Sequence, residues 1–234
     1  MPGIFVLTGV LSLLAILVVL KLVPAAPAIP RQPGWSSFVE VLAHPQLLRM
    51  NLGVFSLHLI QTAMWVLLPS ALVTVGALPV GEHWKVYLPA VLLSFVIMVP
   101  AIIAAEKHGW MKPVFNGAIF LLLLVQLGFA FFGNGLYALS FWLLLFFVAF
   151  NVLEATQPSL ISRIAPAHAK GAALGIYNTT QSLGLFLGGA LGGALAKNSG
   201  STTVWLLCAL VAAVWLVLGL TMTMPVPRPR QPAA

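Results

Sequence analysis

A carboxylate inside an apolar stretch is the strongest chemical signal in this sequence. The chain contains no aspartate, and one of its four glutamates, Glu154, is the only charged residue of the stretch 136–158. A charge at the bilayer centre costs roughly 2.5–3.5 kcal/mol, so such a residue should face a cavity or a partner, or be protonated. Asn151 and Pro158 share its helical face. Glu154 is therefore either a proton or substrate site in a water-accessible pathway or a structural carboxyl bonded to a neighbouring helix or loop.

A second polar face is predicted on a helix over 47–74. His58, Gln61 and Trp65 follow one another at spacings of three and four, which places them on one side of a helix. A donor and acceptor pair beside an indole suits the wall of a substrate pathway, and it also suits interhelical hydrogen bonding and packing. No second histidine, cysteine or carboxylate stands at metal-ligand spacing from His58, so we predict no metal site.

A third group of candidates combines glycines with polar side chains. The glycines recur every four residues, a spacing that lets two helices approach closely, and we expect them to serve packing. Tyr177 and Gln181 fall near this stripe and are expected to form interhelical hydrogen bonds. Asn178 points about 100° away and is the better candidate for lining a cavity. The stripe comprises Gly184, Gly188 and Gly192.

Several chemistries lack the residues that they need. The sequence holds no GxSxG, HExxH or Walker A motif, and without aspartate an intramembrane aspartyl protease is excluded. We therefore expect neither an enzyme nor a cofactor. A retinal protein is disfavoured because every lysine lies at the end of a predicted helix or in a loop. His44, His83, His108 and His168 also fall near predicted helix ends, and we expect them to be solvated.

The composition indicates that lipid, not water, surrounds most of the chain. Of 234 residues, 61% are hydrophobic and 6% are charged, whereas soluble domains carry about 25% charged residues. The net charge of +7 comes from basic residues that stand singly between apolar stretches. This distribution is typical of topology signals, and it argues against a nucleic-acid partner.

Seven apolar stretches are long enough to cross about 30 Å of hydrocarbon, which needs roughly 20 residues. We thus predict an all-α integral membrane protein with seven transmembrane helices. The predicted spans are approximately 3–23, 47–74, 84–105, 112–132, 136–158, 170–196 and 202–224.

The connection 24–46 differs from the short loops elsewhere. It begins with four prolines, which indicate a stiff linker. The residues after them predict a short surface helix with Trp35, Phe38, Val39 and Leu42 on one side. We divide the chain into a helix (1–23), a cytoplasmic linker (24–46), a six-helix bundle (47–224) and a cytoplasmic tail (225–234).

The orientation follows from the excess of Lys and Arg in cytoplasmic loops. Alternate loops divide these residues nine against two, which places the amino terminus outside and the carboxyl terminus in the cytoplasm. The first side carries Lys21, Arg31, Arg49, Lys107, Lys112, Arg163, Lys170, Arg228 and Arg230, and the other carries Lys85 and Lys197.

The stretch around Glu154 and the loop after it resemble the tenth and eleventh helices of YajR-like transporters of the major facilitator superfamily. Residues 83–89, 105–107 and 111–115 resemble the eighth helix of these proteins and the loop that follows. The motif residues are Asn151-Val152-Leu153-Glu154-Ala155, Pro158-Ser159-Leu160-Ile161-Ser162, Ala165-Pro166, Lys170-Gly171, Gly175, Tyr177, Gln181 and Leu187-Gly188-Gly189.

The resemblance implies the carboxyl-terminal half of a twelve-helix transporter, from the sixth helix to the twelfth. It implies proton-coupled efflux of small compounds by alternating access across a bacterial inner membrane, with two inverted three-helix repeats in the bundle. The partners implied are lipid, a small-molecule substrate, protons and the missing amino-terminal six-helix half. A seven-helix receptor or binding protein and a non-transporting membrane scaffold are the alternatives.

Overall fold

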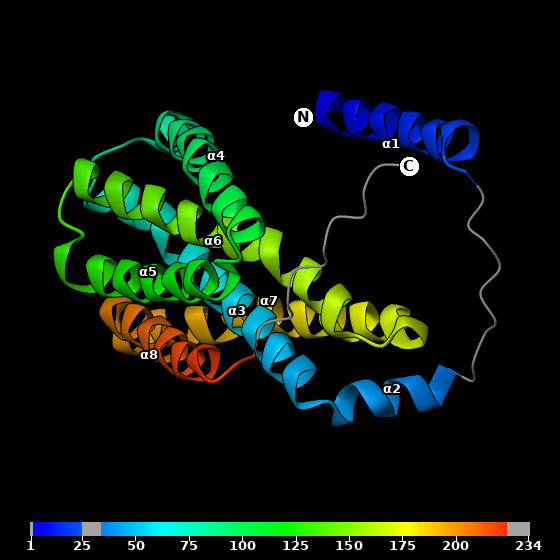
Figure 1. Cartoon of the computed structure of the whole chain (residues 1–234). Helices are drawn as coiled ribbons and strands as arrows, with labels where there is room; N and C mark the ends of the chain where they lie inside the picture. Colours follow the sequence, from blue (N-terminus) through cyan, green and yellow to red (C-terminus); the bar gives the residue numbers. More distant parts are fainter. Residues whose placement is uncertain (1, 25–33, 224–234) are drawn as a thin grey trace. The chain divides into compact units, whose positions relative to one another are not determined.

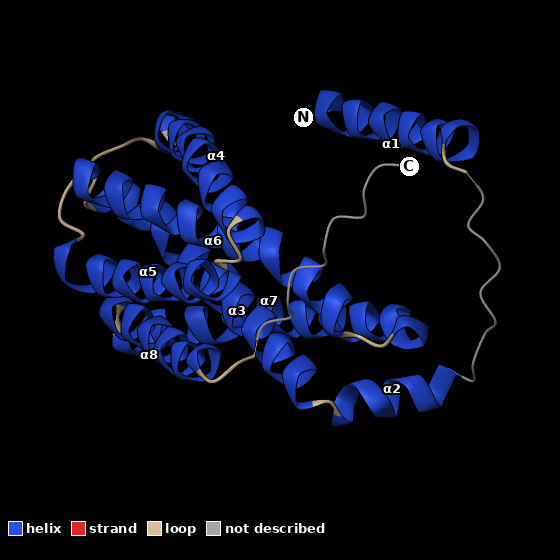
Figure 2. Ribbon diagram, viewed as in Figure 1, coloured by secondary structure: helices blue, strands red, loops and turns tan. Residues whose placement is uncertain are grey.

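The computed structural model describes residues 2–24 and 34–223, and it contains helices and no strands within these residues (Figures 1 and 2). Helix α1 (Pro2–Leu22) belongs to one compact unit, and the remaining helices belong to a second. The four prolines of the predicted linker begin at Pro24, and the other three lie outside the described residues, as does the predicted tail 225–234.

The second unit is a bundle of six long helices with the short helix α2 attached. Two single turns, η1 (Val80–Glu82) and η2 (Ala167–Ala169), precede α4 and α7. The elements are α2 (Gly34–Ala43), α3 (Pro45–Thr74), α4 (Trp84–Lys107), α5 (Met111–Phe132), α6 (Leu136–Ile164), α7 (Lys170–Ser199) and α8 (Ser201–Leu220).

Helix α2 is the short amphipathic helix that the sequence predicts between the linker and the bundle. Val41 is fully buried, and Trp35 on the opposite side is 80% exposed. The side chain of Glu40 lies 2.8 Å from His168 in η2, which ties α2 to the connection between α6 and α7.

The helices of the bundle match the predicted spans closely, and the largest difference concerns Pro158. The prediction ends the fifth span at this proline, whereas α6 continues to Ile164. A proline lacks only its own N–H and frees only the carbonyl four residues earlier, here that of Glu154. Tertiary packing of the following residues, among them the buried Leu160 and Ile161, outweighs the lost hydrogen bond.

By length and composition, six helices among the described residues could cross a membrane. They are α1, α3, α4 with η1, α5, α6 and α8. The predicted span 170–196 corresponds to α7, a helix of 30 residues whose glycines and polar side chains make it less apolar than the others. The fold is that of an all-α membrane protein, and the count of seven spans stays a prediction.

The packing follows a two-fold pattern. Helix α3 packs against α7 as α6 packs against α4, and α3 packs against α8 as α6 packs against α5. The remaining pairs include α3 with α6 and α5 with α8, which join equivalent helices, and α4 with α5, which matches α7 with α8. Exchanging α3–α5 for α6–α8 preserves these contacts, as expected of two three-helix repeats. The contact of α6 with α7 has no counterpart between α3 and α4 among the described residues.

The contact between α3 and α7 depends on the glycine stripe. A Cβ at Gly184 would lie 2.5 Å from the backbone oxygen of Phe55, and one at Gly188 would collide with that of Leu59. A Cβ at Gly192 would lie 2.9 Å from Cα of Ala63. The backbones of the two helices are thus in direct contact at three successive turns, which only glycine permits.

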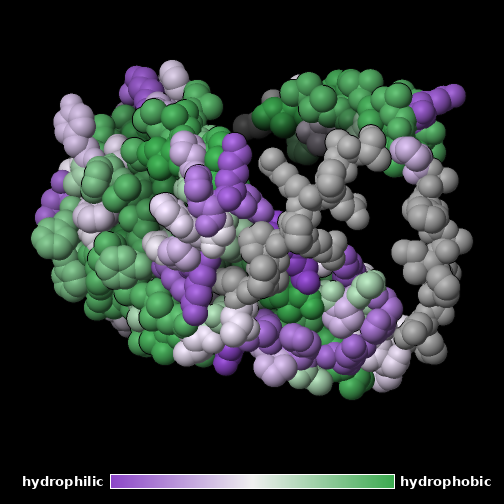
Figure 3. Space-filling model, viewed as in Figure 1, coloured by the Kyte–Doolittle hydropathy of each residue, from purple (hydrophilic) through white to green (hydrophobic). Residues whose placement is uncertain are grey.

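Apolar side chains cover much of the outside of the bundle as well as its core (Figure 3). Leu92 and Val96 on α4 and Leu210 and Val217 on α8 are more than half exposed, which suits a surface in contact with hydrocarbon. The expectation that His83 is solvated is wrong: its side chain is buried and its ring packs against Tyr87 at 5.6 Å. Burial beside an aromatic ring is available there because η1 folds back onto α4.

The glycine stripe yields a stability prediction. Gly188→Ala should lower the free energy of unfolding by about 1–3 kcal/mol, because the new methyl group forces two backbones apart. Gly193→Ala is the matched control, since a Cβ at that position meets nothing within 4 Å. Thermal unfolding in detergent should show a lower Tm for Gly188→Ala alone, and equal Tm values for the two variants would contradict the close contact.

Candidate functional site

The polar residues of α3, α6 and α7 gather at one place inside the bundle. His58 on α3 is buried, with 3% of its surface exposed. Its Nε2 lies 2.8 Å from Nε2 of Gln181 on α7 and 3.5 Å from Oε2 of Glu154 on α6. Side chains of three helices thus meet at one ring nitrogen.

The second ring nitrogen of His58 fixes how the imidazole is protonated. Nδ1 lies 3.0 Å from the backbone oxygen of Val54, one turn earlier on α3. A carbonyl oxygen only accepts hydrogen bonds, so Nδ1 carries a hydrogen and donates it. In the neutral ring Nε2 is then an acceptor, which agrees with a hydrogen bond from the Gln181 amide. The ring of Phe150 on α6 lies edge-on against the imidazole, with centroids 5.9 Å apart.

Glu154 is partly open and partly buried. Its side chain is 37% exposed, yet its Oε2, which faces His58, is buried and has no hydrogen-bond donor among the described residues. A buried carboxylate oxygen without a donor costs free energy. Each of the chain's four glutamates lies within 4 Å of a basic side chain, and only the Glu154 pair involves a buried partner within a candidate membrane span.

Gln157 forms a second polar contact, this one between α6 and α7. It is fully buried one turn beyond Glu154 on α6, and its Oε1 accepts a hydrogen bond of 3.4 Å from the hydroxyl of Tyr177. The interhelical hydrogen bonds expected of Tyr177 and Gln181 are therefore present. The Nε2 group of Gln157 has no acceptor among the described residues.

Asn151 contacts a different helix from Glu154. Its Nδ2 donates a 2.8 Å hydrogen bond to Oγ of Ser94 on α4, and Ser94 in turn donates to the backbone oxygen of Val91. Although Asn151 and Glu154 share a face of α6, the structure assigns Asn151 to the contact between α4 and α6.

The other predicted residues lie around this network without joining it by hydrogen bonds. Trp65 packs against Tyr87 at 5.3 Å and against Phe147 at 6.2 Å, in an aromatic cluster of α3, α4 and α6. Gln61 is half-buried and Asn178 is exposed. We call these residues the polar network: His58 with Gln181 and Glu154, and the adjacent pair of Gln157 and Tyr177.

The sequence does not predict two of the residues that form these hydrogen bonds, Gln157 and Ser94. Gln157 follows Glu154 by three residues, so its spacing on the same face was the signal that could have revealed it. Ser94 stands alone among apolar residues of α4, and its partner on α6 is 57 residues away. No local pattern indicates such a pairing.

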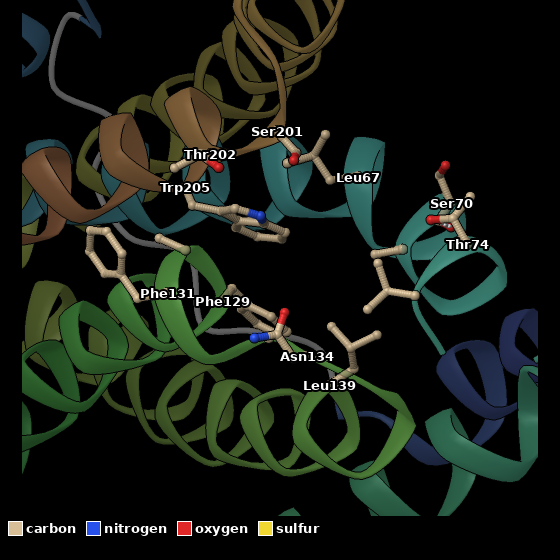
Figure 4. A pocket seen from close by; sticks show the side chains of 14 residues that line it. Leu67, Ser70, Thr74, Phe129, Phe131, Asn134, Leu139, Ser201, Thr202 and Trp205 are labelled. Atoms are coloured by element: carbon tan, nitrogen blue, oxygen red, sulfur yellow. Dashed lines mark hydrogen bonds between the residues drawn. The ribbon is translucent and has the colours of Figure 1, made fainter. Parts of the chain in front are cut away.

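A separate cavity of about 290 Å³ opens at the end of the bundle where α3 and α5 end and α6 and α8 begin (Figure 4). Its lining is uncharged, with Phe129 and Trp205 stacked at 4.7 Å beside Ser70, Asn134 and Ser201. None of the predicted site residues lines it.

The chemistry available at the polar network is the exchange of protons and hydrogen bonds. Histidine is the residue type whose side chain ordinarily exchanges protons nearest to neutral pH. The carboxylate beside it can balance a positive charge on the ring. Among residues 2–24 and 34–223, no three histidine, cysteine or acidic side chains gather closely enough to hold a metal ion.

Known proteins share this sequence pattern. The family model of the Major Facilitator Superfamily matches residues 1–188 and 112–234. The chain belongs to the major facilitator superfamily. It is 42% identical to the inner membrane transport protein YajR of Escherichia coli K12 over 189 residues, which are 81% of this chain and 41% of that protein.

Two further relatives come from Buchnera aphidicola. The uncharacterized transporter BU466 of Buchnera aphidicola subsp. Acyrthosiphon pisum is 30% identical over 60% of this chain and 36% of its own length. An uncharacterized transporter of Buchnera aphidicola subsp. Baizongia pistaciae is 27% identical over 78% of this chain and 46% of its own. The chain spans less than half the length of these curated relatives.

The Tyr177–Gln157 hydrogen bond yields a second prediction. Tyr177→Phe should lower the free energy of unfolding by about 1–3 kcal/mol, because it leaves the fully buried Gln157 amide without its donor. Tyr137→Phe removes the same hydroxyl from a side chain that is 90% exposed and should change little. Thermal unfolding of both variants checks this, and an unchanged Tm in Tyr177→Phe would show that the contact contributes nothing.

Proposed function

We propose that this chain forms the carboxyl-terminal half of a secondary active transporter that couples proton movement to the efflux of small compounds by alternating access. The observation that carries the proposal is the His58–Glu154 pair, an imidazole and a carboxylate 3.5 Å apart inside a helical bundle of the major facilitator superfamily. An ionisable pair inside a membrane bundle marks proton and ion pathways by default.

The exposure of the two partners supports a path for protons. Glu154 is 37% exposed whereas the His58 side chain is 4% exposed. A proton from a water-filled cavity can therefore reach the carboxylate first and the imidazole second. The half-buried Gln61 follows His58 by three residues, and the exposed Asn178 precedes Gln181 by three. Both are proposed to contact the substrate.

The proposal includes a second bundle. In this superfamily the pathway runs between two six-helix bundles, and helices α3–α8 provide one of them. We infer that an amino-terminal bundle, supplied by the same protein or by a second chain, completes the cavity. YajR is named as an inner membrane transport protein, and we propose the same membrane for this chain. We further propose that its carboxyl terminus lies in the cytoplasm.

Transport by the assembled protein provides the test. The chain joined to a compatible amino-terminal half should drive efflux of a fluorescent dye when a proton gradient is imposed. Glu154→Gln should reduce this efflux by at least about tenfold, because the amide neither carries a proton nor balances a charge on His58. Glu82→Gln, which breaks an exposed ion pair with Lys85, is the control and should leave efflux unchanged. Full proton-driven efflux in Glu154→Gln would overturn the proposal.

The orientation is tested separately by cysteine labelling. The native Cys208 is fully buried and should react little. In intact cells a membrane-impermeant maleimide should label Asn198→Cys at the end of α7, and it should label His108→Cys only after the cells are opened, because the excess of Lys and Arg places His108 inside. The reverse pattern would invert the topology.

A further inference from the structure

The geometry at His58 points to Gln181 as a positioning residue: we propose that it holds His58 in the neutral form, and that protonation of His58 transfers its hydrogen bond from Gln181 on α7 to Glu154 on α6. Gln181 and Glu154 compete for one atom, Nε2 of His58. Its role in transport rests on the proposed function, whereas the exchange of partners does not.

With the Gln181 amide nitrogen facing the ring, as in this structure, the two partners of Nε2 require opposite protonation states. With Nδ1 donating to Val54, a neutral ring offers a lone pair at Nε2, and the amide of Gln181 at 2.8 Å donates to it. A charged ring carries a hydrogen at Nε2, and an amide nitrogen cannot accept it. The carboxylate of Glu154 accepts it and carries the compensating charge.

The unpaired atom of Glu154 matches this exchange. Oε2 lies 3.5 Å from Nε2, which is beyond a strong hydrogen bond, and it has no donor among the described residues. The observed geometry is thus that of the neutral ring, bonded to Gln181. When Nε2 gains a proton, an N–H bond forms, Oε2 receives its missing donor, and the ring's positive charge is balanced by the carboxylate.

The titratable groups of this network are Glu154 on α6 and Tyr177 on α7, and Phe150 of α6 covers the imidazole ring. Tyr177 donates its hydroxyl to Gln157 and has no hydrogen bond to His58. Glu154 is therefore the group that can answer a charge on the ring. In this proposal the proton reaches Nε2 of His58 from the Glu154 carboxylate and returns to that carboxylate when it leaves.

The exchange links protonation to the packing of three helices. In the neutral state α3 is bonded to α7 through Gln181, next to the glycine stripe that joins the same two helices. In the charged state α3 is bonded to α6. Protonation thus removes a hydrogen bond between α3 and α7 and adds one between α3 and α6. A proton in this way changes which helix is bonded to α3.

Nitrogen NMR of the whole chain tests the exchange without any transport assay. The chain is labelled with ¹⁵N-histidine in detergent, and His58→Asn identifies the His58 signals among the five histidines. At alkaline pH the wild type should show the neutral tautomer with hydrogen on Nδ1. The opposite tautomer, with hydrogen on Nε2, would overturn the proposal.

Substitutions at position 181 then measure its contribution. Gln181→Leu removes the donor to the neutral ring, so at a fixed pH the ratio of charged to neutral His58 should rise about three- to tenfold, the factor expected for one hydrogen bond. The nearly isosteric Gln181→Glu replaces the donor by an acceptor and should raise the ratio further, which keeps the test decisive if Gln181→Leu fails to fold. Glu154→Gln should lower the ratio.

Ser182→Ala is the matched control on the same helix. The Ser182 hydroxyl is exposed and donates only to its own helix, to the backbone oxygen of Asn178. Its substitution should leave the His58 ratio unchanged. A purely structural role for Gln181 would alter thermal stability without this spectroscopic shift, so identical titrations of Gln181→Glu and Ser182→Ala would reject the proposal.

The NMR and transport results separate the two proposals. A shifted ratio in the Gln181 variants together with unchanged efflux in Glu154→Gln would keep the exchange of partners and reject proton coupling. Unshifted ratios together with a loss of efflux in Glu154→Gln would reject the exchange and keep proton coupling.

Discussion

The direct backbone contact between α3 and α7 is the constraint on which the rest of the site depends. Gly184, Gly188 and Gly192 leave no side chain between the two helices. Helices this close bring an amide on α7 within 2.8 Å of an imidazole on α3. Because lipid offers helices little hydrophobic driving force to associate, such packing and a few interhelical hydrogen bonds hold the bundle together.

The polar network combines two demands that usually conflict. A membrane bundle must satisfy its buried polar groups, and several hydroxyls of the described residues do so by donating to their own helix, as Thr62 and Thr156 do. The network around His58 leaves single buried atoms unpaired, namely Oε2 of Glu154 and Nε2 of Gln157, as do other residues of the bundle such as Gln126. An unpaired polar atom in a low-dielectric interior costs free energy, and the exchange proposed for His58 would supply Oε2 of Glu154 with a donor.

The two-fold pattern of helix contacts places this site at the centre of the bundle. Helices α3 and α6 occupy equivalent positions in the two repeats and pack against each other, and they carry His58 and Glu154. Their neighbours α7 and α4 are also equivalent, and they supply Gln181 and Ser94. The ion pair of Glu106 and Arg163, at 2.6 Å, joins the ends of α4 and α6 on one side of the bundle. The contacts of His58 with Glu154 and of Asn151 with Ser94 thus lie between helices that the repeat pattern brings together, whereas Tyr177 and Gln157 join α6 and α7, a pair outside that pattern.

The sequence alone determined the membrane class, the approximate positions of the helices and the residues that are out of place in an apolar chain. These follow from local rules, because roughly 20 apolar residues span a bilayer and an intramembrane glutamate stands out by composition. Only the tertiary structure decided that α6 continues past Pro158 and that His83 is buried beside Tyr87. It also decided that Glu154 lies beside His58 and that Asn151 bonds Ser94 instead. Such interhelical pairings depend on which helix faces approach each other across 57 to 123 residues of chain, a choice made by close packing that no local spacing encodes.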